Sequence, residues 1–567
     1  MPCPPATLQS VVRLLLALIV LNALLAFGNL WPSAWPRPEV RLSVDLFAGV
    51  ISLVLWTRWR GAVSARGIGV VAALASLWVL LHYIDVTIPA LLGRPVNAWW
   101  DGQHLWQLAR MGGEFAAVWQ IAAAVLAACA GLALLFALVR ACVRAVAMAA
   151  ATPRWQAPLA ALGTAVLLTH GAASLTGHDV KRLFAPPVGT MVAQQASLLS
   201  RALSRTAGGQ QLGPGPAFDR DVAALGGADV LVLFAEAYGA ITLDRPELVT
   251  ALAERRRSLQ RALDAGGRQV VSARVTSPTF GGASWLAHAA MLSGIDTQDP
   301  DDYALLLTTQ RPTLVSHFAQ HGYRTIGWMP GLQRPWPEGA FYGFDRLADA
   351  DNTGYAGLPF GYWRIPDQVS IALLQQQELQ GATHAARDAG DGLRNVSLRS
   401  ADATAPRTPR FIVFPTLTTH APFRPVPPYL ADPQRLLAAD AFSDDDVNRA
   451  LTAPVSWTDP TPAYIDAMHY QFDWLTRWLR EEAPHNMLLI VIGDHQPIGG
   501  VTGPDASWDV PVHVIGTDEA VLARLEAAGF RRGLQPDATA LGPMHGLTQM
   551  LIDAFAGDLS RRSALMP

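Results

Sequence analysis

The sequence predicts a protein in two parts, an N-terminal bundle of about five transmembrane helices followed by an α/β domain on the extracytoplasmic side. Two observations predict this fold class. The first part carries apolar runs long enough to cross a hydrocarbon layer of about 30 Å. After residue 228, short apolar strands alternate with longer helical stretches, which is typical of a sheet covered on both faces. With 51% hydrophobic and 16% charged residues, the composition excludes a disordered chain.

The apolar runs lie near residues 9–28, 41–57, 67–92, 115–139 and 157–176. We expect five spans within a transmembrane domain of residues 1–176. The second run is the weakest, because Asp45 and Arg58 leave only a short uninterrupted stretch. The first run is longer than the apolar part of a secretory signal, and further runs follow it, so we interpret it as an anchor.

Arginines in the short loops between the spans predict the orientation of the chain in the membrane, because arginine-rich loops face the cytoplasm. The second and fourth connections carry them, namely Arg58, Arg60, Arg66, Arg140, Arg144 and Arg154. The N-terminus then lies inside, and everything after the fifth span lies outside. Because arginine far outnumbers lysine and the helices are rich in alanine, we expect a GC-rich bacterial source. The predicted location is therefore the bacterial cytoplasmic membrane, with the second part periplasmic or extracellular.

Residues 177–220 predict an interfacial helix and a linker. Met191–Arg205 has apolar residues at helical spacing, and a stretch rich in glycine and proline follows it. The three cysteines at positions 3, 129 and 142 all precede this segment, which excludes a disulfide framework or a cysteine zinc site after it. The second part also lacks a basic stripe with interleaved aromatics, so no nucleic-acid partner is expected.

Residues 221–567 form the predicted catalytic domain. Six strands are expected at Asp229–Ala235, Gln269–Val275, Tyr323–Trp328, Phe411–Leu417, Met487–Ile492 and Val510–Ile515. Helices are expected at Pro246–Ala265, Trp285–Leu292, Pro312–Gln320, Pro366–Leu379 and Pro462–Glu482. In sheets of this kind ligands bind beyond the carboxyl ends of the strands, so the chemistry is expected there.

Three predicted strands end in side chains that bind metals or phosphates. Glu236 follows the first strand, His420 follows the fourth, and the pair Asp494 and His495 follows the fifth. Two carboxylates and an imidazole suit Zn or Mn and leave a position for a nucleophile that the metal activates. Taken singly, Glu236 could be a turn residue and His420 a structural histidine. Their joint appearance at strand ends favours a site.

The motifs AEAYG, TTHAPF and GDHQP, in this order after a membrane-spanning front, resemble the sulfatase-related branch of the alkaline phosphatase superfamily. In layout, the chain looks like the lipoteichoic acid synthases and phosphoethanolamine transferases. The resemblance implies that Glu236, Asp494 and His495 hold a divalent metal, Zn or Mn. It also implies that His420 lies near the substrate phosphate, where it could protonate a leaving oxygen.

The resemblance further implies a nucleophile at the start of a helix after a glycine-rich turn, here in SPTFGGASWLAHAAMLSG. Ser284 and Gly294 match the spacing of the sulfatase signature, so Ser284 is the expected nucleophile and fourth metal ligand. A helix N-terminus also stabilises anionic phosphate oxygens. Thr279 is the alternative nucleophile, because transferases of this family generally use threonine, and Ser284 could instead be a plain N-cap.

Several residues depart from the family pattern and limit which reaction the resemblance implies. Leu286 and His288 stand where a formylglycine sulfatase has proline and arginine, which argues against sulfatase activity. His288 could contact substrate or lie on the helix surface. The absence of disulfides favours the lipoteichoic acid synthase pattern, while an expected arginine has only Arg334 as its nearest candidate.

We therefore expect a transferase that moves a phosphoglycerol or phosphoethanolamine group through a phosphoserine intermediate. The partners would be a phospholipid donor and an envelope glycan or lipid acceptor. Two alternatives stay open: a phosphodiesterase or phosphatase with water as acceptor, and a degenerate, non-catalytic envelope scaffold.

Overall fold

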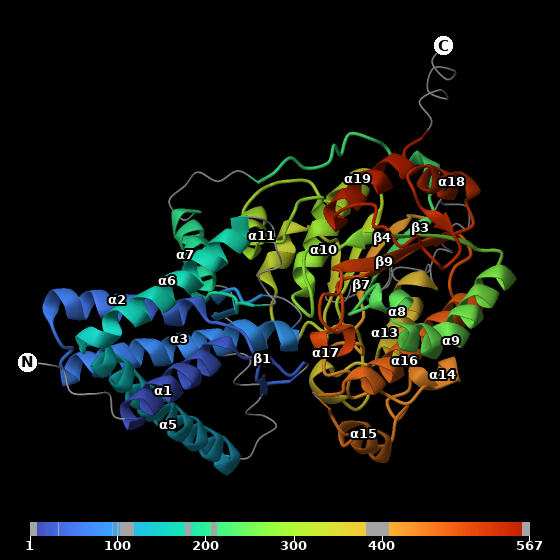
Figure 1. Cartoon of the computed structure of the whole chain (residues 1–567). Helices are drawn as coiled ribbons and strands as arrows, with labels where there is room; N and C mark the ends of the chain where they lie inside the picture. The colour runs from blue at the N-terminus through green and yellow to red at the C-terminus, as the bar shows by residue number, and fades with distance from the viewer. Residues whose placement is uncertain are drawn as a thin grey trace, which may run out of the picture. The chain divides into compact units, whose positions relative to one another are not determined.

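The chain forms two compact units, Met1–Gln210 and Gln211–Pro567. The computed structural model describes residues 8–31, 33–92, 95–98, 101–102, 118–175, 183–205, 212–380, 407–456 and 458–557. Figure 1 shows the first unit, from blue to green, as helices and the second, from green to red, as helices around a sheet. Each unit is described by itself.

The first unit is a bundle of helices. They are α1 (Leu8–Ala26), α2 (Val44–Arg60), α3 (Ala65–Leu92), α5 (Val118–Ala150), α6 (Pro153–Leu175) and α7 (Val188–Arg205). A two-residue pair of strands, β1 (Gly28–Asn29) and β2 (Pro36–Arg37), lies between the first two helices. In the described part of the chain, α1, α3, α5 and α6 are long and apolar enough to cross a membrane. Four spans, and not five, meet this criterion.

The second apolar run forms α2, which has 17 residues, with Asp45 in its first turn and Arg58 and Arg60 in its last. At 17 residues α2 is too short to qualify as a span, and these charges shorten its apolar stretch further. The Asp45 carboxylate has a hydrogen-bond partner within the unit, because its Oδ2 accepts from the Val188 N–H at 2.8 Å. The helix packs closely on α6, where a Cβ added to Gly163 would lie 3.1 Å from the backbone oxygen of Phe47.

The arginines near the fourth connection differ from the prediction. Arg140 and Arg144 lie inside α5, which continues to Ala150, and Arg154 lies in the first turn of α6. The connection itself is only residues 151–152. The helix continues because alanine and valine, both compatible with a helix, separate the arginines. The basic residues therefore mark helix ends and not a loop.

The second unit is built on a mixed sheet with the order β10-β4-β9-β8-β3-β7-β5-β6. Its strands are β3 (Asp229–Ala235), β4 (Gln269–Thr276), β5 (Arg324–Trp328), β6 (Arg346–Ala348), β7 (Arg410–Pro415), β8 (Met487–Gly493), β9 (Asp509–Gly516) and β10 (Arg531–Arg532). The five strands from β8 to β6 run parallel, and β9 runs antiparallel to both of its neighbours. All six expected strands are confirmed, with ends shifted by at most two residues.

Helices cover both faces of the sheet. On one face, Leu231 and Leu233 of β3 pack in a core with α9 (Pro246–Ala265), α13 (Asp367–Leu374) and α16 (Thr461–Glu481). On the other, Val230 and Val232 pack with α10 (Ser284–Ser293), α12 (Leu314–Gln320), α18 (Glu519–Ala527) and α19 (Met544–Phe555). Successive β3 residues thus face opposite layers, and the whole strand is buried, as in a sheet with two covered faces.

Shorter helical segments connect these layers. They are α8 (Ile241–Asp244), α11 (Pro300–Leu306), α14 (Pro433–Leu436), α15 (Asp444–Leu451), α17 (Gly499–Thr502), the 3₁₀ turns η2 (Ala223–Leu225), η3 (Pro337–Phe341) and η4 (Gly361–Trp363), and the π-helix η5 (Gln375–Leu379).

The parallel strands β7, β3 and β8 are neighbours and end together. Phe234 pairs with Pro415 on one side and with Ile492 on the other, and Ala235 pairs with Gly493. The loops that follow these strands therefore leave the same edge of the sheet. This register brings Glu236, the loop around His420 and the Asp494–His495 pair together.

Candidate active site

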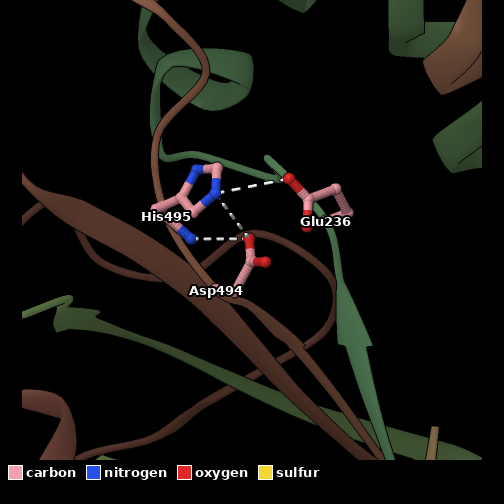
Figure 2. A group of neighbouring side chains, drawn as sticks. All are labelled: Glu236, Asp494 and His495. Carbon is pink, nitrogen blue, oxygen red and sulfur yellow. Dashed lines mark hydrogen bonds and ion pairs between the residues drawn. The ribbon is translucent and has the colours of Figure 1, made fainter. Parts of the chain in front are cut away.

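Glu236, Asp494 and His495 form one buried cluster at this edge. One ligand atom from each lies within 4.8 Å of the other two. His495 Nε2 is 3.3 Å from Glu236 Oε1 and 3.9 Å from Asp494 Oδ1. Figure 2 shows the two carboxylates and the imidazole pointing toward one another from two strand ends. The three expected metal ligands are thus brought together.

Backbone groups hold the cluster in place. Asp494 Oδ1 accepts hydrogen bonds from the N–H groups of Ala237, at 2.8 Å, and His495, at 2.7 Å. His495 Nδ1 lies 2.7 Å from the Gln496 carbonyl, which fixes this nitrogen as the donor and turns Nε2 toward the carboxylates. Gly493 lets the strands approach, because a Cβ there would lie 2.0 Å from the Tyr238 carbonyl oxygen.

Ser284 is the first residue of α10 and lies against this cluster. Its Oγ donates to Glu236 Oε2 at 3.0 Å and is 3.2 Å from His495 Nε2. The turn before it uses left-handed backbone at Gly281 and at Ala283, with φ of 65° and 61°. A non-glycine residue in this region is strained, and such strain is common where a turn positions a functional side chain.

Thr279, the alternative nucleophile, is buried and turned away. Its Oγ1 donates to the Gly282 carbonyl at 2.6 Å, so the hydroxyl closes the glycine-rich turn. Gly294, ten residues after Ser284, ends α10 with a φ of 68°, and a Cβ there would collide with Pro216 at 2.4 Å. The spacing that the sequence shares with the sulfatase signature therefore has a structural reason at both ends of the helix.

His420 lies in the loop after β7 and lines the same cleft as Glu236 and Ser284. Its Nδ1 is 2.7 Å from the Ala421 carbonyl, which leaves Nε2 for other partners. The ring of Trp363 meets the imidazole edge to face, with centroids 4.8 Å apart. His420 is thus placed beside the cluster without being one of its close ligands.

Asp367 is a site-forming residue that the sequence did not reveal. Its two carboxylate oxygens accept hydrogen bonds from the N–H groups of Leu417 and Thr418, each at 2.8 Å, and so shape the loop that carries His420. Burial raises the pKa of Asp367 to about 6, although these N–H donors act in the opposite direction. No local sequence signal connects residue 367 with residue 417, because the link is purely tertiary.

Two other expectations are corrected. His288 is not on the outer surface of the helix: it is half-buried, packs against Phe234 with ring centroids 4.2 Å apart, and lines the cleft. It faces inward because it stands one helical turn after Ser284 on the same side of α10. Arg334 is exposed and does not line the cleft, so the nearest candidate for the family arginine is not brought into the site.

The electrostatics of the cluster favour a bound cation. Burial alone would raise the pKa of Glu236, but the charges of His495 and His420 outweigh it and lower that pKa well below its usual range. Burial and the neighbouring charge of Glu236 raise the pKa of Asp494. Burial would lower the pKa of His495, but Asp494 and Glu236 raise it to about 9. Two crowded carboxylates thus draw positive charge into the site.

Unsatisfied polar atoms support the same conclusion. Asp494 Oδ2 and His288 Nε2 are buried without a hydrogen-bond partner among the described residues, and they lie 4.0 Å apart. A buried carboxylate oxygen without a partner is costly unless a ligand satisfies it. The donor set of two carboxylates, one imidazole and a hydroxyl suits Zn²⁺ or Mn²⁺. The residues present therefore fit a divalent metal.

One comparison with known proteins matches the part of the chain that contains most of the site. The sulfatase family model matches residues 274–518, a range that contains Ser284, His420, Asp494 and His495, while Glu236 precedes it. The comparison with curated proteins finds no match.

Three solved structures are similar to the chain. A protein in the alkaline phosphatase superfamily from Vibrio parahaemolyticus has 13% identity and a TM-score of 0.30, over 54% of this chain and 63% of that one. The lipoteichoic acid synthase LtaP from Listeria monocytogenes has 11% identity and a TM-score of 0.33, over 60% of this chain and 79% of that one. The phosphoglycerol transferase GacH from Streptococcus pyogenes, in complex with sn-glycerol-1-phosphate, has 10% identity and a TM-score of 0.32, over 61% and 94%. The chain thus spans less than two thirds of the Vibrio protein.

Proposed function

Because the sulfatase family model matches residues 274–518, we propose that the protein is a membrane-anchored, metal-dependent phosphotransferase that acts outside the cytoplasmic membrane. The family match over these residues agrees with the resemblance that the motifs carry. The proposal adds the reaction: transfer of a phospholipid-derived alkyl-phosphate group, phosphoglycerol or phosphoethanolamine, to an envelope glycan or lipid. The helices α1, α3, α5 and α6 support the membrane anchor by their length and apolarity.

One observation carries the proposal: a serine hydroxyl at a helix N-terminus lies within 3.2 Å of both a carboxylate and an imidazole of a metal-type cluster. Glu236, Asp494, His495 and Ser284 would hold Zn²⁺ or Mn²⁺. When bound, the cation lowers the pKa of the Ser284 hydroxyl and offsets charge on the phosphoryl oxygens. The nucleophile and its activating groups are thus in one place.

In the first step, Ser284 Oγ forms a bond to the phosphorus of the donor phosphodiester, and its proton passes to solvent. The bond from phosphorus to the diacylglycerol oxygen breaks, and His420 Nε2 supplies the proton that this oxygen needs. The N–H groups in the first turn of α10 face the phosphoryl oxygens and stabilise their charge. Diacylglycerol is left in the membrane, which explains why the enzyme is anchored beside its donor.

In the second step, an acceptor hydroxyl attacks the phosphorus of phosphoserine, and His420 Nε2 accepts its proton. The bond from phosphorus to Ser284 Oγ breaks, and this oxygen takes a proton from solvent, which restores the enzyme. Two substitutions at one phosphorus give ping-pong kinetics. Water in place of the acceptor gives hydrolysis with the same residues, so the experiment must distinguish transfer from hydrolysis.

The test is the intact mass of the full chain after incubation with Mn²⁺ or Zn²⁺ and labelled phosphatidylglycerol or phosphatidylethanolamine. We expect an increase of one phosphoglycerol or phosphoethanolamine unit that is absent in Ser284→Ala. Thr279→Ala is the matched control, since it removes a neighbouring hydroxyl and should keep the adduct. An adduct that survives in Ser284→Ala and disappears in Thr279→Ala would move the nucleophile to Thr279.

Two further outcomes separate the alternatives. Release of labelled head group without a labelled acceptor, in the presence of envelope lipids and glycans, would favour a phosphodiesterase. A purified chain that binds neither Mn²⁺ nor Zn²⁺ would favour a scaffold, because a scaffold has no need for a metal. Either result contradicts the transferase proposal.

A further inference from the structure

A cleft of about 300 Å³ opens directly from the proposed nucleophile. Glu236, Ser284 and His420 are among the residues that line it. This volume is far above the roughly 10–15 Å³ that a single water molecule requires, so the cleft can hold a substituent of the substrate next to the reacting phosphate. The chemistry of its wall therefore bears on which substituent binds.

The wall that the other lining residues form is largely apolar. It is formed largely by aromatic rings and aliphatic chains, including Leu292, Met329, Leu332, Trp336, Phe344 and Trp363. The Trp336 ring stacks on the Tyr342 ring, with centroids 5.6 Å apart, so the rings support one another. Gly331 lets the wall close, because a Cβ there would lie 2.7 Å from Leu417 and 3.2 Å from Trp363. The wall is therefore a packed surface.

Charge is nearly absent from the wall. Among the described residues that line the cleft, there is no lysine or arginine, and the one carboxylate is Glu236 of the metal cluster. The hydroxyl and imidazole side chains of the lining are few, namely Ser284, His288, Tyr342, Thr416 and His420. A polyol head group in this space would therefore replace only part of the hydrogen bonds that it makes to water. An apolar group would instead gain from leaving water. The lining therefore favours an apolar substituent over a hydroxylated one.

An ammonium group fits less well. Cation–π binding needs an open ring face, and the cages that hold quaternary ammonium groups use several. Here stacking on Tyr342 covers one face of Trp336, and Trp363 is engaged with His420. The aliphatic chains of Leu292, Met329 and Leu332, which offer no such interaction, share the wall with these rings. Nor does the lining add an anion besides Glu236.

We propose that this cleft binds an apolar ester group of the substrate, so that the lipid side of a phosphodiester, and not its polar head group, lies beside Ser284. This inference rests on the proposed function, because it assigns the substrate class of the same site. The apolar wall of the cleft, which includes Leu292, Leu332 and Trp363, is then the part of the site that determines specificity. The shared chemistry is an alkyl or aryl group on phosphate, whether it belongs to a membrane lipid or to a soluble ester.

The test is calorimetric binding of simple phosphonates to the full chain in nanodiscs, after its Mn²⁺ content has been measured. Methyl-, hexyl-, phenyl- and 2-aminoethylphosphonate share one anionic group and differ only in the substituent. We expect hexyl- and phenylphosphonate to bind at least about tenfold more tightly than methylphosphonate, since each buried methylene adds affinity. They should also show a more negative heat capacity change, the mark of apolar burial.

Variants locate the effect. Leu332→Asp places a charge in the wall and should reduce the ratio of hexyl to methyl affinity by at least about tenfold. Leu332→Ala is a milder second variant in case the charge prevents folding, and it should reduce the ratio less. Leu437→Ala removes an exposed leucine outside the cleft and is the matched control.

Each outcome decides the inference. Tighter binding of 2-aminoethylphosphonate than of hexylphosphonate would overturn it in favour of a cation cage. Equal affinities across the series, or no binding to a metal-loaded chain, would show that the cleft does not recognise the substituent. A clear preference for hexylphosphonate in a protein that forms no phosphoserine adduct would support the apolar cleft and reject the transferase. Failure of one proposal is therefore distinguishable from failure of the other.

Discussion

Asp494 uses one carboxylate oxygen for the fold and leaves the other for a ligand. Oδ1 accepts two backbone N–H groups, whereas Oδ2 is buried without a partner among the described residues. This division separates the structural role of the residue from its proposed role in metal binding. An amide side chain has an oxygen that can keep the first role and a nitrogen that cannot bind a cation.

Asp494→Asn should therefore lose the metal while it keeps the fold. We expect metal occupancy to fall by roughly tenfold or more, since even groups outside the coordination sphere usually change affinity by about 10–100-fold. The measurement is metal content by mass spectrometry, together with thermal unfolding of the metal-free chains. Asp473→Asn, at a partly exposed aspartate that pairs with Arg255, is the control. Full occupancy in Asp494→Asn would remove this residue from the ligand set.

His513, which is not part of the Glu236–Asp494–His495 cluster, makes the stability of the fold depend on pH. Its Nδ1 is 2.6 Å from Ser272 Oγ and its Nε2 is 3.1 Å from the Tyr238 hydroxyl. Burial, with a smaller effect from the positive charge of Arg256, lowers the pKa of His513 to about 3. The folded state therefore binds its proton less readily than the unfolded state, where the pKa is about 6.5.

The sign of this linkage predicts a loss of stability in acid. The contribution is fully present above pH 6.5 and is lost as the pH falls from 6.5 toward 3, because only the unfolded state gains the proton. Between pH 7.5 and 5.0 the loss is about 2 kcal/mol for this one group. His513→Gln cannot titrate, so its thermal unfolding should depend less on pH than that of the unaltered chain by this amount. Parallel pH profiles for the two chains would contradict the assignment.

The π-helix η5 shows how tertiary contacts reshape an element. The sequence predicts one helix over Pro366–Leu379, but the α-helix ends at Leu374 and the last turn is widened. Three side chains of this turn have partners elsewhere: Gln375 accepts from the Trp478 indole at 3.0 Å, Gln377 donates to the Thr353 carbonyl at 2.6 Å, and Glu378 pairs with arginines. These contacts outweigh the regular helical hydrogen bonds.

Glu378 joins the π-helix to the edge of the sheet. Its fully buried carboxylate pairs with Arg324 of β5 at 2.7 Å and also contacts Arg346 of β6. Glu378→Gln should lower the free energy of unfolding by roughly 3 kcal/mol, since removing one partner leaves the others uncompensated. Chemical or thermal unfolding measures this, with Glu254→Gln at an exposed position of α9 as the control for losing an arginine pair. A loss no larger than the control's would mean that the arginines are satisfied by solvent.

Elements with a strong local pattern could be predicted, and the others could not. β3 is a run of buried apolar residues, and its bounds are predicted without error. β6 and β10 have three and two residues, too few to show a period of two. α19 was not among the predicted helices although Leu547, Leu551 and Phe555 have helical spacing, so a signal for it existed.

The same division holds for the candidate site. Glu236, Asp494 and His495 could be predicted because each directly follows an apolar strand, and parallel strands bring their ends together. Asp367 could not, because its role depends on a loop 50 residues away. The environment of His288 could be predicted only in part: its place one turn after Ser284 follows from the helix, whereas its contact with Phe234 of β3 depends on tertiary packing.

At the scale of the whole molecule, the clustered ligands, the nucleophile candidate and the cleft all lie in the unit Gln211–Pro567. The apolar helices lie in the unit Met1–Gln210. Chemistry and membrane attachment are thus separate properties of the chain. The side of the membrane on which the catalytic unit lies then depends on how many helices cross the membrane.

Whether the number of spans is even or odd decides on which side of the membrane the catalytic unit lies relative to the N-terminus. That number depends on whether α2 crosses. Four crossings would place the N-terminus and the catalytic unit on the same side, whereas a fifth would place them on opposite sides. A helix of 17 residues is about 25 Å long, which is short of a 30 Å hydrocarbon core by an amount that local thinning accommodates. Because α2 packs among α5 and α6 in the core of the bundle, we expect it to cross with them.

Thiol labelling with a membrane-impermeant maleimide tests this expectation in single-cysteine variants of the full chain. Native Cys3, with Cys129 and Cys142 replaced by alanine, reports the N-terminus. Ala523→Cys, at an exposed position of α18 in a chain without other cysteines, reports the catalytic unit. With α2 crossing, Cys3 is labelled only in inverted vesicles and Ala523→Cys only in spheroplasts. Labelling of both from the same side would reduce the spans to an even number and leave α2 as a helix that does not cross.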